Sequence, residues 1–193
     1  EMSAARPKVK TEVEMTFMSE KTKQADLFQR EWHSGQVDKA GMPYAEHPAR
    51  VAKLVQTHPS FSALIPELQE SVVCAAYFHD VIEDCGVKRE DLAAKGFSAE
   101  TIDAVSLLTK EESIPKDEFD IVSYYKALGA TPLARMVKMA DMADNSNHAR
   151  QALLSEIKAA KNETVDTEKY SELLPLLEPS DEEIQWWSSA RKL

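Results

Sequence analysis

Residues 66–86, PELQESVVCAAYFHDVIEDCG, are the stretch that most restricts how this chain can fold. Its apolar residues recur at helical spacing, at Leu68, Val72, Val73, Ala76, Tyr77 and Val81. The VVCAAYF run is apolar on nearly every side, and a helix of that kind lies at the centre of a fold with other elements packed around it. The pattern predicts one continuous, central helix that ends at Gly86.

The rest of the chain also has helical patterns and no convincing strand. Apolar periodicity, caps and stops predict helices at 25–36, from His47 onward, 91–95, 101–110 with Ser98 as cap, 117–129 with Gly129 as stop, 133–145 after Thr131 and Pro132, and beyond Ser180, whose capping box includes Glu183. Residues 1–20 are unperiodic, so we expect a flexible N-terminal arm. The predicted fold class is therefore all-α, with a single domain over 21–193 that includes the C-terminal helices.

Charge and composition exclude several kinds of protein. The formal net charge of −10 argues against binding to nucleic acid or to an anionic membrane. The chain has no run of about 18 apolar residues, and its first residues lack the apolar stretch of a secretion signal. Its two cysteines, Cys74 and Cys85, are too few for a disulfide framework. We expect a cytoplasmic protein that binds anions through a locally positive pocket or a metal.

Four ionisable residues close the predicted central helix, at His79, Asp80, Glu83 and Asp84. On a continuous helix these side chains would project into one arc of about 140°. Carboxylates near a helix end are commonly just a solvated face. The apolar sequence before them favours the other interpretation, in which the charges face a cavity or a ligand.

An adjacent histidine and aspartate can each donate one ligand atom to a divalent cation. Two further ligand candidates are His47, at the start of the second predicted helix, and Asp141, inside the apolar VKMADMADN segment. A histidine before proline is more often a cap, and a lone helical aspartate is more often exposed. The joint pattern favours a metal site.

Three motifs in order, YAEHPARVA (44–52), FHDVIEDC (78–85) and VKMADMADN (137–145), carry a resemblance to a known family. They resemble the HD-domain metal-dependent phosphohydrolases, and specifically the hydrolase domain of RelA/SpoT proteins and the small metazoan SpoT homologues, over roughly residues 33–148. The resemblance implies an HD-type helical bundle that hydrolyses the 3′-pyrophosphate of (p)ppGpp. It also implies a manganese ion bound by His47, His79, Asp80 and Asp141.

The same resemblance implies roles for residues around the metal. Glu83 and Asp84 would serve the hydrolytic step. The expected substrate-binding residues are Lys39, Lys116, Asn145, His148 and Tyr170, with Lys110 and Lys138 as further candidates for phosphate charge.

Other positions depart from the family pattern. Asp38, Asn147 and Asp166 stand where the family has arginines, and the arginine matching Asp38 stacks on guanine. Hydrolysis of (p)ppGpp is therefore the leading prediction, and the alternatives are a phosphohydrolase for another nucleotide or phosphoester and a non-catalytic regulatory module. From the charge alone, Asp38→Arg should tighten ppGpp binding.

Trp186 and Trp187 leave a homodimer possible, although such residues more often cover a protein's own core.

Overall fold

The computed structural model describes residues 18–110, 113–115 and 117–193, and it is built of helices. No strand occurs in those ranges; Val37 and Pro43 form one isolated antiparallel bridge. The helices are α1 (Glu20–Trp32), α2 (Glu46–Gln56), α3 (Pro66–Phe78), α4 (Val81–Cys85), α5 (Arg89–Ala94), α6 (Ala99–Leu108), α7 (Ile121–Gly129), α8 (Pro132–Asn145), α9 (His148–Ala159), α10 (Lys169–Leu173) and α11 (Asp181–Ala190), with short 3-10 turns at Phe61–Ala63 and Leu174–Leu177. The all-α prediction is confirmed.

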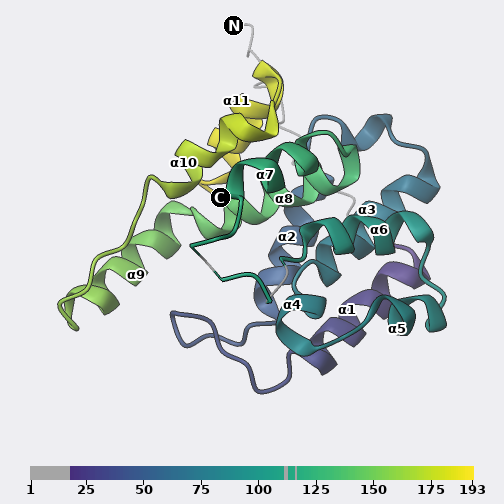
Figure 1. The fold of residues 1–193 in the computed structure, drawn as a ribbon, viewed down its shortest axis with the longest axis horizontal. Coiled ribbons are helices and arrows are strands. Elements are labelled where there is room, and N and C mark those ends of the chain that lie inside the picture. Colours follow the sequence, from purple (N-terminus) through teal and green to yellow (C-terminus); the bar gives the residue numbers. More distant parts are fainter. Residues whose placement is uncertain (1–17, 111–112, 116) are drawn as a thin grey trace, which may run out of the picture.

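Helix α3 lies at the centre, as its apolar sequence predicts. It packs against α1, α2, α6 and α8, while α9 and the segment after it extend from one side of the bundle (Figure 1). Val72, Ala75 and Phe78 of α3 are fully buried. None of the described helices is long and apolar enough to cross a bilayer.

The prediction of one continuous helix through residues 66–86 is wrong. Helix α3 ends at Phe78 and α4 begins at Val81, so His79 and Asp80 lie at the junction between two helices. In a continuous helix the Ala76 carbonyl accepts the N–H of residue 80. Here the His79 ring Nδ1 lies 2.7 Å from that carbonyl oxygen and competes for it, which favours a break. Gly86, with φ of 66°, then ends α4.

The first helix also differs from its prediction, because α1 spans Glu20–Trp32 and not 25–36. Ser19 and Thr22 form reciprocal side-chain caps, a pairing that the usual search for glutamate at the third position overlooks. The first 17 residues of the predicted arm lie outside the described residues.

The predicted caps at Ser98 and Ser180 and the predicted stop at Gly129 are confirmed. Ser98 accepts the N–H of Thr101, and Ser180 and Glu183 form a capping box. Helix α7 ends at Gly129, although it begins at Ile121, four residues after the predicted start.

The two C-terminal tryptophans pack within the chain's own fold. Trp187 is buried, and the Trp186 indole Nε1 donates to the Thr57 hydroxyl at 3.0 Å. Both tryptophans belong to the core contacts, so they give the dimer hypothesis no support.

Candidate active site

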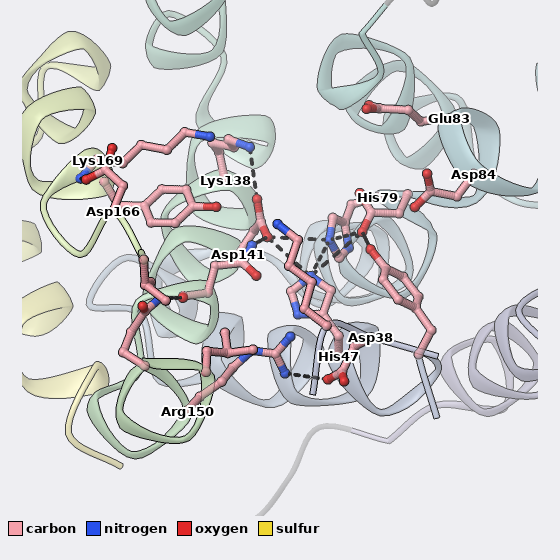
Figure 2. A pocket seen from close by; sticks show the side chains of 18 of the residues that line it. Asp38, His47, His79, Glu83, Asp84, Lys138, Asp141, Arg150, Asp166 and Lys169 are labelled. Atoms are coloured by element: carbon pink, nitrogen blue, oxygen red, sulfur yellow. Dashed lines mark hydrogen bonds and ion pairs between the residues drawn. The ribbon is translucent and has the colours of Figure 1, made fainter. Parts of the chain in front are cut away.

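A pocket of about 580 Å³ opens between α2, the α3–α4 junction, α8, α9 and α10. Its wall combines acids, histidines and cations. Figure 2 shows Glu83 and Asp84 on one side, Lys169 and Asp166 on the other, and His47, His79 and Asp141 between them.

All four predicted metal ligands come together in this pocket. The Nε2 atoms of His47 and His79 are 3.2 Å apart, and the Asp80 Oδ2 atom lies 3.1 Å from His79 Nε2. One ligand atom from each of these three residues falls within 4.8 Å of the others. Asp141 approaches from α8, with Oδ1 at 3.3 Å from His47 Nε2 and 3.8 Å from His79 Nε2. Two nitrogen and two oxygen donors suit a divalent cation.

The electrostatics of the cluster also favour a cation. Burial lowers the pKa of His47, but its hydrogen bonds to Asp141 and Asp144 outweigh burial and raise the pKa to about 9. Burial likewise opposes ionisation of Asp80, yet the charge of His79 and a hydrogen bond from it lower the pKa of this carboxyl. A site that stabilises positive charge on buried imidazoles would also stabilise a metal ion.

Neighbouring polar groups hold the aspartates in place. The Tyr44 hydroxyl donates to Asp80 Oδ2 at 2.6 Å. Lys138 and Asn145 both donate to Asp141, at 2.9 Å and 2.5 Å. Tyr44 was not predicted as a site residue, because its contact with Asp80 spans 36 positions in the sequence.

The acid pair lies beside the cluster on α4. Glu83 is held by the Lys110 backbone N–H at 3.1 Å, and the Lys110 ammonium lies 3.7 Å from its other oxygen. Among the described residues, Asp84 pairs with no lysine or arginine, and burial together with the charges of Asp80 and Glu83 raises the pKa of its carboxyl. A carboxylate with a raised pKa is a better proton acceptor near neutral pH.

Three of the expected substrate-binding residues line the pocket, namely Lys39, Asn145 and Tyr170. His148 does not line it, because this residue is exposed at the start of α9. Lys116 lies outside the described residues. The pocket also contains cations that the sequence patterns did not single out, at Arg150, Lys158 and Lys169.

Asp38 has a different role from the one its sequence position suggests. One carboxylate oxygen accepts the backbone N–H groups of Ala40 and Met42, at 2.8 and 3.0 Å. The other oxygen pairs with Arg150 Nη1 at 2.8 Å, and the Asp38 side chain is only 4% exposed. Asp38 is thus a neutralised part of the wall and not a free charge that repels phosphate (Figure 2). This overturns the basis for expecting Asp38→Arg to tighten ppGpp binding.

Sequence comparison finds relatives of this chain among known proteins. No model of a known protein family matches the chain. A guanosine-3′,5′-bis(diphosphate) 3′-pyrophosphohydrolase of Vibrio cholerae is 32% identical over 133 residues, which cover 68% of this chain. Human MESH1, which has the same enzyme name, is 32% identical over 104 residues, or 54% of this chain. The chain resembles the SpoT- and MESH1-type hydrolases.

The resemblance to SpoT- and MESH1-type proteins extends to the fold. A solved structure described as a metazoan ortholog of SpoT that hydrolyses ppGpp superposes with a TM-score of 0.66, at 19% identity, over 91% of this chain and 96% of that chain. The aligned part of this chain spans 18% of the Vibrio cholerae protein and 54% of human MESH1. The shared fold places the histidine and aspartate cluster in an all-α scaffold of the SpoT-ortholog type.

Proposed function

We propose that this protein is a metal-dependent phosphohydrolase that removes the 3′-pyrophosphate of (p)ppGpp. The observation that carries the proposal is the meeting of His47, His79, Asp80 and Asp141 in a pocket that also holds an acid pair and several lysines. The likeness to enzymes named as ppGpp 3′-pyrophosphohydrolases supports this choice of substrate.

The donor set fits a divalent metal, and we propose Mn²⁺. A mixed set of imidazole nitrogens and carboxylate oxygens suits Mn²⁺ better than Mg²⁺ or Ca²⁺, because the last two ions prefer oxygen ligands alone. Bound by these four residues, the ion would lower the pKa of a coordinated water and offset the charge of the phosphate.

The two acids of α4 would act on the attacking water. Asp84, with its raised pKa, would accept the proton of the attacking water, while Glu83, held by Lys110, would orient that water.

The lysines of the pocket would bind the phosphates. Within the described part of the chain, Lys39, Lys158 and Lys169 form no ion pair, unlike Lys110 and Lys138. Burial and the charges of neighbouring lysines lower the pKa of Lys169, and an anionic substrate would relieve that repulsion. Lysines without a carboxylate partner among the described residues favour a substrate with more than one phosphate group.

Turnover of defined substrates tests the proposal. The protein, loaded with Mn²⁺, should release pyrophosphate from ppGpp and leave GDP, with far slower cleavage of GTP, ATP and a simple phosphodiester. Asp141→Ala should bind less than one equivalent of metal and lose turnover. Full metal occupancy in Asp141→Ala would contradict the four-ligand site.

A second candidate is a phosphohydrolase for another nucleotide or phosphoester. It is favoured by the state of Asp38, which is committed to Arg150 and the backbone and presents no cation for stacking on guanine. Mn²⁺-dependent cleavage of a different substrate in the same panel, without release of pyrophosphate from ppGpp, would establish this candidate in place of the first.

We also propose that the protein acts in the cytoplasm on free nucleotides. Its formal net charge of −10 disfavours nucleic acids and anionic membranes as partners, since both repel acidic surfaces.

A further inference from the structure

A second acid on α8 lies behind the metal cluster. Asp144 follows Asp141 by three residues, and its Oδ2 atom is 2.7 Å from the Nδ1 atom of His47. Arg50, on α2, donates two hydrogen bonds to the same carboxylate, from Nε to Oδ1 at 2.6 Å and from Nη2 to Oδ2 at 2.9 Å. The His47 and Asp144 side chains are 4% and 5% exposed, so water does not compete for this contact.

This arrangement determines which nitrogen of His47 faces the cluster. An ionised carboxylate only accepts hydrogen bonds, so the His47 Nδ1 atom carries a proton and donates it to Asp144. In the neutral ring the lone pair is then on Nε2, the nitrogen that lies 3.2 Å from His79 Nε2 and 3.3 Å from Asp141 Oδ1.

Arg50 fixes the carboxylate in turn. A two-pronged contact between guanidinium and carboxylate restricts rotation of the acid and offsets its charge. Both Asp144 oxygens are engaged on the side of His47 away from the cluster, so Asp144 is not a fifth metal ligand.

We propose that Asp144 and Arg50 are a positioning pair that sets the affinity of the cluster for a divalent cation through His47. Neither residue would touch the ion or the substrate. Partners of this kind orient metal-binding histidines and make them better donors. The inference goes beyond the proposed function, because it concerns metal affinity and does not depend on which phosphoester is cleaved.

The same chain provides a matched control. His58, Glu183 and Arg135 form another group of a histidine, a carboxylate and an arginine, in which the histidine and the carboxylate are buried. Glu183 Oε1 lies 3.4 Å from His58 Nε2 and 3.2 Å from Arg135 Nη2. This group joins α8 and α11 to the end of α2, and none of its members lines the pocket. Its disruption should reduce stability without changing metal affinity.

Calorimetric titration of the metal-free full chain with Mn²⁺ tests the pair. Asp144→Asn should weaken Mn²⁺ binding by about 10- to 100-fold, as loss of a partner behind a metal ligand does elsewhere. Arg50→Gln should weaken Mn²⁺ binding less than Asp144→Asn does. The Mn²⁺ affinity of Arg50→Lys should fall between those of Arg50→Gln and the wild type, because lysine keeps the positive charge but cannot make the two-pronged contact with the carboxylate. Glu183→Gln should keep wild-type affinity.

Two results would overturn the inference. One is wild-type Mn²⁺ affinity in both Asp144→Asn and Arg50→Gln. The other is an equal loss in Glu183→Gln, which would assign the effect to general destabilisation. If Asp144→Asn does not fold, the Arg50 variants still decide, since the Arg50 side chain is 40% exposed. The titration contains no nucleotide, so an inability to hydrolyse ppGpp would defeat the proposed function and leave this result standing.

Discussion

At the scale of single residues, the acids of α4 should separate chemistry from metal binding. Glu83 and Asp84 lie beside the cluster but are not among the residues that gather around His47 Nε2. Glu83→Gln and Asp84→Asn should therefore keep bound metal and lose roughly 100-fold or more in kcat, the usual effect of removing a positioned acid or base. Metal analysis and steady-state kinetics check this. The control is Asp103→Asn, at an exposed acid of α6 that pairs with Arg89 of α5. Near-normal rates in both pocket variants would assign Glu83 and Asp84 to a solvated surface.

Asp38 leads to a prediction opposite to the one that charge alone suggests. Asp38→Arg removes two hydrogen bonds to backbone N–H groups and places a cation against Arg150. It should lower the free energy of unfolding by about 3 kcal/mol, the range for breaking a buried ion pair, and should raise KM. Asp38→Asn keeps an oxygen for the backbone contacts and should be milder. Tighter ppGpp binding by Asp38→Arg, with normal stability, would contradict this assignment.

At the scale of elements, His58 anchors α11 and makes the fold sensitive to acid. Its Nδ1 atom accepts the Ser60 N–H at 3.2 Å, and the charge of Glu183 is already paired with Arg135, so the buried ring is neutral. Burial lowers the pKa of His58 to about 4, from 6.5 in the unfolded chain. Between these values the unfolded state binds more protons, so this contribution to stability is complete above pH 6.5 and is lost as the pH falls toward 4.

Replacement of His58 should therefore flatten the stability profile. Urea unfolding at pH 7 and pH 4.5 should show a decline that is about 2–3 kcal/mol larger in the wild type than in His58→Gln. The comparison removes the effect of carboxylates, which titrate in both proteins. Equal declines in the two proteins would show that His58 is not buried as a neutral ring.

At the scale of the whole molecule, metal binding should stabilise the fold. The four proposed ligands come from α2, the α3–α4 junction and α8, and the helices that carry them form the centre of the bundle. A ligand that binds only the folded state adds about 2.7 kcal/mol at 100 times its Kd. Mn²⁺ at that excess should raise Tm by about 5–10 °C in a chain of this size. Differential scanning calorimetry with Mn²⁺ and with EDTA measures the shift.

A matched variant identifies the origin of that shift. His79→Ala removes one proposed ligand and should abolish the rise in Tm. An undiminished rise in this variant would place the stabilising Mn²⁺ elsewhere on the protein.

Features that depend on neighbouring residues could be predicted from the sequence. Helical periodicity, the caps at Ser98 and Ser180 and the stop at Gly129 are local, because a helix forms its hydrogen bonds within a few residues. The apolar run in α3 likewise predicted its central place, since an apolar helix has to be covered on all sides.

Features that depend on contacts between residues far apart in the sequence could be recognised only in the tertiary structure. Periodicity does not reveal that a side chain at His79 competes for a backbone acceptor, so the break between α3 and α4 was missed. Asp141 and Asp144 look equivalent in ADMAD, and only the packing of α2 against α8 turns the first toward the cluster and the second toward Nδ1 of His47. Asp38 meets Arg150 across 112 positions, and that contact converts an apparent repulsive charge into a neutralised wall. The role of a charged side chain depends on the groups that it contacts. Many of those groups lie far away in the sequence, so only the folded chain brings them together.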